Sequence, residues 1–341
     1  MSLFRRKEKG KVLRTETLGL HWDTESPFLF ASHHNDDYPP GNAQQAPPLS
    51  EIGGRNLGRD YKKIYGFRMY NGKVVPGFPL HAHWGYETVT IAEKGYVDHF
   101  DCKGNQGRYG FGDVQWLTAG RRYQHNEMYP LASSDGRNPV DITQIMINLP
   151  LKDKDSEPEF RMMWAEDIPV VRKDGFTVKV YAGEYDGVKA LPPSDVSWAK
   201  DPDHHVRILR VAMEPGAEFE LPAISDTMGR NVYLTECGST FSVDGEQFEL
   251  ARRFKLPGDE TIVLTNGDSD AVFWLLEGEP IEERQIQYGP VVLANDKEVR
   301  NAINIIRIRE FKDWPWDVID KAQPKGTGRF VKYADGREEH R

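Results

Sequence analysis

Short runs of apolar residues, bounded by Gly, Pro, Asn and Asp, make up most of the chain up to residue 295. Such runs are typical of β-strands, whereas an amphipathic helix needs apolar residues three and four apart over a longer stretch. The segment Glu87–Asp101 predicts two strands joined by a glycine-containing turn, and Gly112–Gly120 predicts another strand. The pattern therefore favours an all-β protein.

The same order of elements occurs twice along the chain. Gly229–Gly267 aligns with Gly85–Gly120: in each, a strand meets a glycine turn, a second strand follows, and a Gly-Asp turn precedes a strand that ends in Thr-x-Gly. We interpret this as a tandem duplication of one β-barrel unit, because closing each sheet into a barrel covers its strand edges.

Two regions fall outside the repeat. Residues 36–62 are rich in Pro, Gly and polar residues, which predicts a long loop or lid. Residues 295–307 begin with an N-cap signal and place apolar residues on one helical face, which predicts a helix packed on a barrel. The predicted organisation is a first barrel, a connection, a second barrel with the packing helix, and a polar tail, at 1–150, 151–197, 198–310 and 311–341.

The composition indicates a globular protein and disfavours nucleic-acid binding. The 341 residues are 38% hydrophobic and 11% aromatic, enough to build a core. The formal net charge is −9, whereas phosphate contacts need clustered Lys and Arg. We therefore expect no direct nucleic-acid binding, although a protein partner that itself binds DNA stays open.

Targeting signals and cysteines favour the cytoplasm. The basic start of the sequence lacks the apolar run of a signal peptide, and no stretch approaches the roughly 20 apolar residues of a membrane-spanning helix. The two cysteines, Cys102 and Cys237, are too few for a disulfide framework at this length. We expect two reduced thiols, a cytoplasmic location and no membrane association.

Histidines gather in the first repeat in a spacing that indicates a metal site. His81 and His83 are two apart in a predicted strand, so their side chains point the same way, and His125 and Glu127 repeat this spacing on a later strand. Two such pairs on neighbouring strands can converge inside a barrel. Three imidazoles and one carboxylate suit Fe(II), Mn, Ni, Cu or Zn, and are poor ligands for Ca or Mg.

Other candidates are weighed against simpler explanations. Glu87 is an alternate ligand or a partner that orients an imidazole. His99 could line the opening of the barrel, but a surface position is favoured. His33 and His34 are consecutive, and consecutive strand residues point to opposite faces, so a polar loop is favoured there. Residues 206–339 contain no histidine, so the second barrel is predicted to lack a metal.

Four segments of the sequence resemble the pirin family, a branch of the bicupins. They lie at 78–90, 110–128, 144–160 and 279–303, and the part from Gly112 to Met128 is the most diagnostic. The resemblance implies two tandem cupin (jelly-roll) β-barrels with a C-terminal helix. It also implies one metal, usually iron, in the N-terminal cupin, with its ligands at His81, His83, His125 and Glu127.

The sequence departs from the family pattern beside these ligands. The family commonly has His-Pro-His-Arg-Gly where this chain has Ala82 and Trp84. Arg122 and Tyr123 stand where a Gly and a small apolar residue are usual. None of these changes removes a ligand. We predict Trp84, Glu87, Arg122 and Tyr123 as pocket residues that narrow or recharge the substrate site.

The family includes proteins with quercetin 2,3-dioxygenase activity and others described as redox-responsive transcriptional cofactors. The resemblance therefore favours a metal-dependent dioxygenase, most simply an Fe(II) enzyme, that takes a flavonol-like aromatic substrate and O₂. Glu127 would be both ligand and catalytic base. The alternative is a non-catalytic redox-responsive metalloprotein that binds a protein partner.

Overall fold

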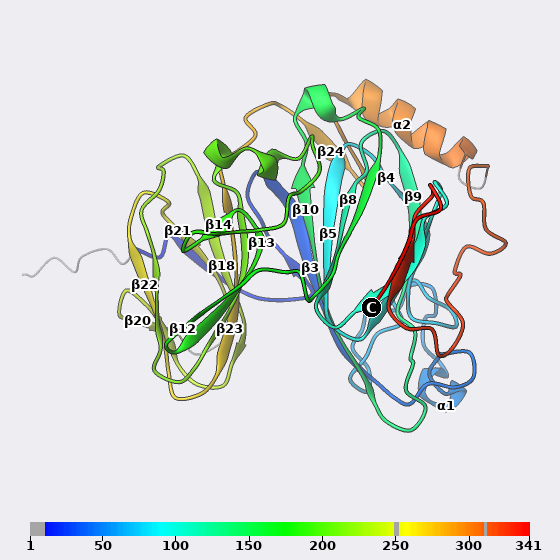
Figure 1. The fold of residues 1–341 in the computed structure, drawn as a ribbon, viewed down its shortest axis with the longest axis horizontal. Coiled ribbons are helices and arrows are strands. Elements are labelled where there is room, and N and C mark those ends of the chain that lie inside the picture. Colours follow the sequence, from blue (N-terminus) through cyan, green and yellow to red (C-terminus); the bar gives the residue numbers. More distant parts are fainter. Residues whose placement is uncertain (1–10, 249–251, 310–311) are drawn as a thin grey trace, which may run out of the picture. The chain divides into compact units, whose positions relative to one another are not determined.

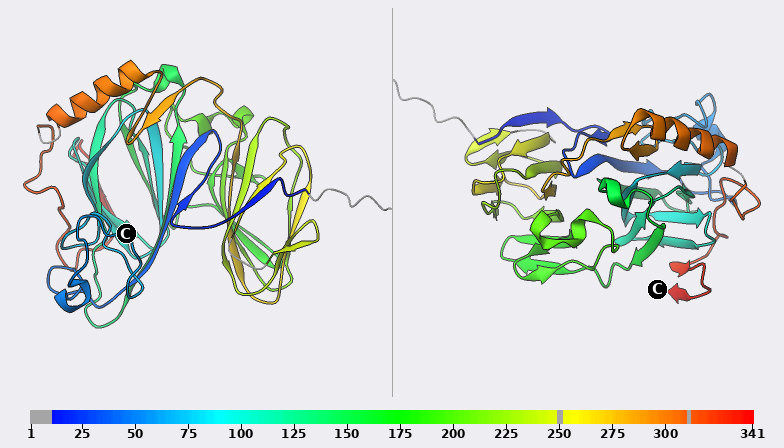
Figure 2. Two further views of the ribbon diagram at one scale, coloured as in Figure 1. Left: turned by 180° about the vertical axis from the view of Figure 1, so that it is seen from behind. Right: turned by 90° about the horizontal axis from the view of Figure 1, so that it is seen from above.

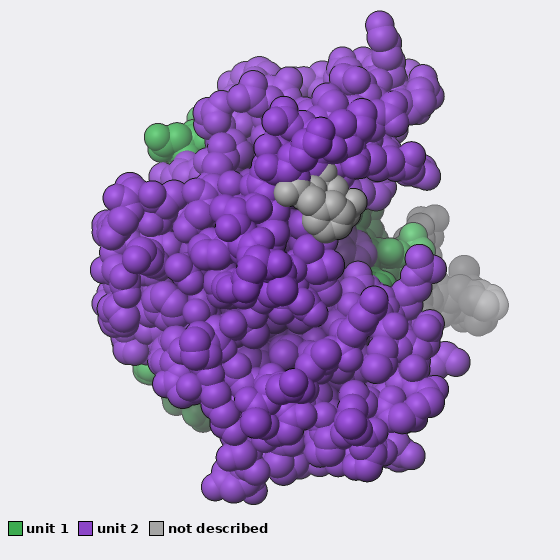
Figure 3. All heavy atoms as spheres, turned by 90° about the vertical axis from the view of Figure 1, so that its right-hand side faces the viewer, with its two compact units in different colours: residues 1–29, 168–281 green, residues 30–167, 282–341 purple. Residues whose placement is uncertain are grey.

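A computed structural model describes residues 11–248, 252–309 and 312–341 (Figure 1). These residues divide into two compact units, coloured in Figure 3: unit 1 contains residues 1–29 and 168–281, and unit 2 contains residues 30–167 and 282–341. Strands dominate both units, as the apolar pattern predicted. The first ten residues of the predicted first barrel lie outside the described residues.

Unit 2 is built on a barrel of antiparallel strands. Its elements are β3 (Phe28–Tyr38), α1 (Leu49–Ile52), β4 (Gly77–His83), β5 (Tyr86–Lys94), β6 (Tyr96–Asp101), β7 (Gln106–Gly110), β8 (Asp113–Thr118), β9 (Tyr123–Met128), β10 (Asn138–Asn148), η1 (Leu151–Asp153), β11 (Glu159–Met163), β24 (Ile286–Tyr288), β25 (Val291–Leu293), α2 (Asp296–Arg309), β26 (Phe330–Lys332) and β27 (Glu338–His340). The strands of unit 2 follow the order β11-β8-β5-β10-β3 within one sheet and β27-β26-β7-β6-β9-β4 in the other. Their inner faces meet, since Thr90 of β5 bonds Glu127 of β9.

Unit 1 is a second barrel with an apolar interior. Its elements are β1 (Arg14–Thr17), β2 (His21–Trp22), β12 (Val170–Lys173), β13 (Phe176–Ala182), β14 (Glu184–Tyr185), β15 (Val188–Lys189), η2 (Trp198–Lys200), η3 (Pro202–His204), β16 (Arg207–Met213), β17 (Glu218–Leu221), β18 (Gly229–Cys237), β19 (Phe241–Val243), β20 (Glu246–Phe248), β21 (Arg252–Leu256), β22 (Ile262–Asn266) and β23 (Ala271–Gly278). The sheets β1-β21-β18-β23-β16-β13-β12 and β17-β22-β19-β20 enclose one hydrophobic cluster. Its buried residues include four phenylalanines, Phe219, Phe241, Phe254 and Phe273, packed among Val and Leu side chains.

The domain boundaries differ from the predicted ones. Strands β12 and β13, within the predicted connection at 151–197, belong to the large sheet of unit 1. Residues 14–17 pair with β21 of that same sheet rather than with the first barrel. The pattern of a strand shows which face is buried but not which distant strand pairs with it. The sequence therefore could not assign these segments.

The C-terminal part of the chain belongs to unit 2. The predicted helix is confirmed as α2, whose N-cap Asn295 accepts from the Glu298 amide at 3.0 Å. Its buried face packs on β25 and Trp84, so it belongs to unit 2 and not to the second barrel as predicted. Helix α2 is the orange helix in Figure 2. Within the predicted polar tail, β26 pairs with β7 and β27 pairs with β26, so this part of the tail adds strands to the barrel sheet.

The first three residues of the predicted loop at 36–62 are the end of β3, and after Tyr38 the segment contains one further element, α1. The side chain of Gln45 fixes the loop to the barrel. Its Nε2 donates to the backbone carbonyl of Gln323 at 2.7 Å, and its Oε1 accepts from Arg108 at 2.9 Å. The predicted lid role stays a prediction.

In the part of the chain that the structure describes, no helix has the length and hydrophobicity of a membrane-spanning segment.

Candidate metal centre

The candidate site lies on two paired strands of unit 2. In the antiparallel register of β4 and β9, His81 stands opposite His125, with an irregularity between Phe78 and His81. Because side chains alternate along a strand, His81 and His83 share one face of β4, and His125 and Glu127 share one face of β9. That face is the barrel interior. Pairing therefore brings together residues that are far apart in the sequence.

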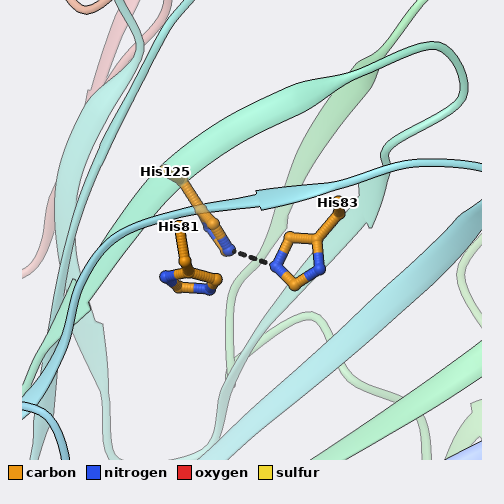
Figure 4. A group of neighbouring side chains, drawn as sticks. All are labelled: His81, His83 and His125. Atoms are coloured by element: carbon orange, nitrogen blue, oxygen red, sulfur yellow. Dashed lines mark hydrogen bonds between the residues drawn. The ribbon is translucent and has the colours of Figure 1, made fainter. Parts of the chain in front are cut away.

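Three imidazoles converge at this point (Figure 4). One ligand atom from each of His81, His83 and His125 lies within 4.8 Å of the others. The Nε2 atoms of His83 and His125 are 2.8 Å apart. Glu127 Oε2 lies 3.8 Å from His81 Nε2 and 3.7 Å from His125 Nε2. Metal–nitrogen bonds of about 2.0–2.1 Å place neighbouring ligand nitrogens roughly 3 Å apart, so this spacing fits one ion.

The other ring nitrogens are already bonded. His81 Nδ1 lies 2.9 Å from the Pro79 carbonyl, which can only accept, so His81 Nδ1 carries the proton. His83 Nδ1 bonds the hydroxyl of Tyr86. A histidine that donates through Nδ1, as His81 does and as His83 can, presents its Nε2 lone pair, which is the usual arrangement of a metal-binding imidazole.

Burial keeps these imidazoles neutral. Desolvation lowers the pKa of His83 and of His125 well below the ordinary histidine value. It also lowers the pKa of His81, although the Glu127 carboxylate opposes this effect. Without a cation, the Nε2 atoms of His83 and His125 share a hydrogen bond of 2.8 Å, and metal binding would require that proton to move so that both lone pairs face the ion. The donor set fits a transition metal such as Fe(II), Mn, Ni, Cu or Zn.

Two residues that the sequence did not single out hold Glu127. Gln144 Nε2 donates to both carboxylate oxygens, at 2.9 and 3.2 Å, and Thr90 Oγ1 donates to Oε1 at 3.2 Å. Thr90 and Gln144 stand opposite each other in the register of β5 and β10. They could not be found from the sequence, because their roles depend on which strands pair.

Glu87 is not placed beside the imidazoles. Its neighbour Tyr86 contacts His83, so strand alternation turns Glu87 to the opposite face of β5. There its carboxylate accepts from Trp116 Nε1 at 3.0 Å and Thr118 Oγ1 at 2.7 Å. The prediction of an alternate ligand or orienting partner is therefore wrong. Glu87 instead ties β5 to β8.

The other predicted pocket residues have structural partners. The indole of Trp84 donates to Asp155 at 3.1 Å, and its ring packs against α2. Arg122 forms an ion pair with Asp313. Trp84 and Arg122 line a cleft of about 470 Å³ that also includes Cys102. Tyr123 is buried, and its hydroxyl donates to Asp101.

Three histidines lie elsewhere than predicted. His99 is fully buried in β6 rather than at the surface, and its Nδ1 lies 3.3 Å from His125 Nδ1. His33 and His34 lie on strand β3, not in a loop. His33 bonds Asp141 at 2.9 Å, while the buried ring of His34 packs against Phe78. The alternating faces of β3 send the two rings to different surroundings.

Comparison with known proteins agrees with this architecture. Residues 16–147 match the Pirin family model, and residues 208–312 match the model for the Pirin C-terminal cupin domain. A pirin-like protein of Solanum lycopersicum is 35% identical over 228 residues, covering 66% of this chain and 74% of its own. The Pirin of Homo sapiens is 32% identical over 269 residues, covering 73% and 84%.

Solved structures share the fold. A quercetin 2,3-dioxygenase from Acinetobacter baumannii superposes with a TM-score of 0.68 at 24% identity, covering 89% of this chain and 99% of its own. GK1651 from Geobacillus kaustophilus gives a TM-score of 0.53 at 26% identity, covering 80% and 97%. With both cupin domains matched in sequence and the two barrels seen in the structure, the chain is a bicupin that belongs to the pirin family.

Proposed function

We propose that unit 2 binds one divalent transition metal through His81, His83, His125 and Glu127. We further propose that the chain is a dioxygenase of the quercetin 2,3-dioxygenase type. The observation that carries this proposal is the convergence of three neutral imidazoles beside a carboxylate in a barrel interior. The fold shared with a protein of that name supplies the candidate reaction. Among the metals that suit the donor set, we propose Fe(II).

The proposed substrates are a flavonol-like aromatic and O₂. The side chain of His81 is 30% exposed, whereas those of His125 and Glu127 are buried, so substrate would approach from the His81 side. The ring of Phe78 lies 6.2 Å from that of His81 and offers an aromatic surface. Offset or edge contacts with such a ring stabilise a planar aromatic ligand.

The residues of the chain divide the chemistry between them. A bound metal would supply Lewis-acid polarisation and a template for the substrate oxygen and O₂. Glu127 would accept the proton of the substrate hydroxyl. Gln144 and Thr90 hold its carboxylate in place through their hydrogen bonds. The buried walls around His83 and His125 exclude water, which strengthens each of these electrostatic interactions.

The test is an assay of quercetin oxidation by the chain loaded with Fe(II), in which O₂ uptake is measured. The expected result is turnover that requires the metal and that is lost when Fe(II) is withheld. Absence of turnover with every flavonol tested, at full metal occupancy, would contradict the enzyme and favour the alternative, a non-catalytic redox-responsive metalloprotein that binds a protein partner.

A further inference from the structure

A chain of buried side chains leads away from His125 on the side opposite its Nε2 atom. His125 Nδ1 lies 3.3 Å from His99 Nδ1, and His99 Nε2 lies 3.1 Å from Asp101 Oδ2. His99 and Asp101 are both fully buried. The ring of His99 is stacked on Phe160 with 4.9 Å between ring centroids. The geometry therefore joins the carboxylate to the candidate ligand through one imidazole.

Asp101 is held as an acceptor. Burial alone would raise its pKa, but hydrogen bonds from His99, Tyr123 and Asn105 keep that pKa below the usual value. The Asn105 amide donates at 2.6 Å to Oδ2, and the backbone amides of Lys103 and Asn105 donate to Oδ1. The indole of Trp316 donates to the backbone carbonyl oxygen of Asp101 at 2.8 Å. The carboxylate is fixed in position.

A His125 ring that offers the lone pair of Nε2 to a metal carries its proton on Nδ1. That Nδ1 then donates to His99 Nδ1 across 3.3 Å. His99 in turn carries a proton on Nε2 and donates it to the Asp101 carboxylate. This leaves the lone pair of His125 on Nε2, where it faces His83 Nε2.

We propose that His99 and Asp101 are positioning residues that fix the Nε2-ligating tautomer and the ring orientation of His125. This inference rests on the proposed metal binding by His125, but not on the dioxygenase activity. The Tyr123 hydroxyl helps to hold Asp101 in this arrangement. Partners of this kind typically account for about 10- to 100-fold in metal affinity.

The experiment compares two isosteric replacements of His99. The amide oxygen of Asn can occupy the place of imidazole Nδ1, whereas the amide of Gln reaches the place of Nε2. His99→Asn therefore keeps an acceptor for His125, and His99→Gln keeps only the contact with Asp101. Affinity for Co(II), measured by calorimetry, should fall by about 10- to 100-fold in His99→Gln. His99→Asn should retain most of the wild-type affinity.

A second measurement needs no variant. Nitrogen-15 NMR of the metal-free wild type should show His125 protonated on Nδ1 and His99 on Nε2. Equal Co(II) affinities in the two variants, or His125 protonated on Nε2, would overturn the proposal. Wild type that binds no Co(II) would refute the metal site itself, and normal Co(II) binding without flavonol turnover would refute only the reaction.

Discussion

The Glu127 carboxylate lies where it could both bind the proposed metal and accept a proton from the substrate. Its carboxylate lies within 4 Å of two imidazoles, and Gln144 and Thr90 hold it there. In Glu127→Gln a carbonyl oxygen remains for weak coordination, but the proton acceptor is lost. We expect turnover to fall by about 10²- to 10⁴-fold while most of the metal is retained, as measured by O₂ uptake and elemental analysis.

Glu87→Gln is the matched control for this change. Glu87 is equally buried, but it lies on the other face of β5 against Trp116 and Thr118. The substitution should alter the free energy of unfolding and leave both turnover and metal content near wild type. An active Glu127→Gln protein, or an equal loss of turnover in both variants, would exclude the base role.

Lys154 gives a pH-dependent prediction. It is buried, and its ammonium group donates to the Gly85 carbonyl at 2.7 Å and to Asn148 at 2.8 Å. Burial lowers the pKa of Lys154 to about 7, although Glu283 opposes this. At pH values between the folded pKa of about 7 and the higher pKa of an unfolded lysine, the Lys154 side chain is protonated in the unfolded chain but not in the folded chain. Stability therefore rises with pH in that window, by up to about 1.4 kcal/mol per unit.

The measurement is urea unfolding across this window in wild type and in Lys154→Met. The variant should lose the rise in unfolding free energy with pH. Lys189→Met is the control, because Lys189 is exposed, and its curve should run parallel to that of wild type. If the Lys154→Met curve also runs parallel to wild type, the folded lysine is not depressed in pKa.

The sequence could identify those site residues whose spacing along a strand already indicates a metal site. His81 and His83 are two residues apart on one strand, and His125 and Glu127 are two apart on another. The structure brings all four side chains together. The sequence could not identify Thr90, Gln144 or His99, because their roles come from the register of other strands. The buried position of His99 depends on the pairing of β6 with β9, which brings His99 against His125, and no local pattern around His99 predicts that pairing.

Among the elements, the C-terminal segment depends on one buried ion pair. Arg108 of β7 bonds Asp98 of β6 through two nitrogens, at 2.6 and 2.8 Å, and both side chains are fully buried. Arg108 also donates to the carbonyls of Gln323 and Thr327, and Asp98 accepts from the Gln323 amide. The pair thus fixes the segment after Trp316 to the outside of the barrel.

Asp98→Asn should destabilise the protein strongly, because it leaves the Arg108 charge buried without a counter-charge. The expected loss is about 3–5 kcal/mol in the free energy of unfolding, measured with urea, together with faster amide exchange at Gln323. Asp37→Asn removes a partner from the exposed pair with Arg137 and should cost at most about 1 kcal/mol. Similar losses in the two variants would contradict the anchoring role.

Elements with a local sequence signal could be predicted, whereas elements that depend on a distant partner could not. Helix α2 was predicted because Asn295 and the apolar positions after it carry a local signal. The strands β26 and β27 are three residues each, and their partner β7 lies far back in the sequence. Their burial depends on that pairing, so a polar tail was the natural prediction from sequence.

In the whole molecule, the two barrels share a fold and differ in what fills them. Sequence repetition predicted the duplication, since both halves keep their turns. The interior of unit 2 carries imidazoles, carboxylates and hydroxyls, whereas unit 1 is filled by Phe, Leu and Val. An apolar interior offers no ligand atoms to an ion. One barrel therefore serves the proposed chemistry.

Metal analysis of the wild type and of His125→Ala, combined with anomalous scattering from crystals, tests whether unit 2 alone holds a metal ion. We expect one ion per chain in the wild type, with its anomalous peak among His81, His83 and His125. Most of that ion should be lost in His125→Ala, and no peak should occur within residues 206–280. Full occupancy in His125→Ala, or an anomalous peak inside the second barrel, would contradict the proposed metal site.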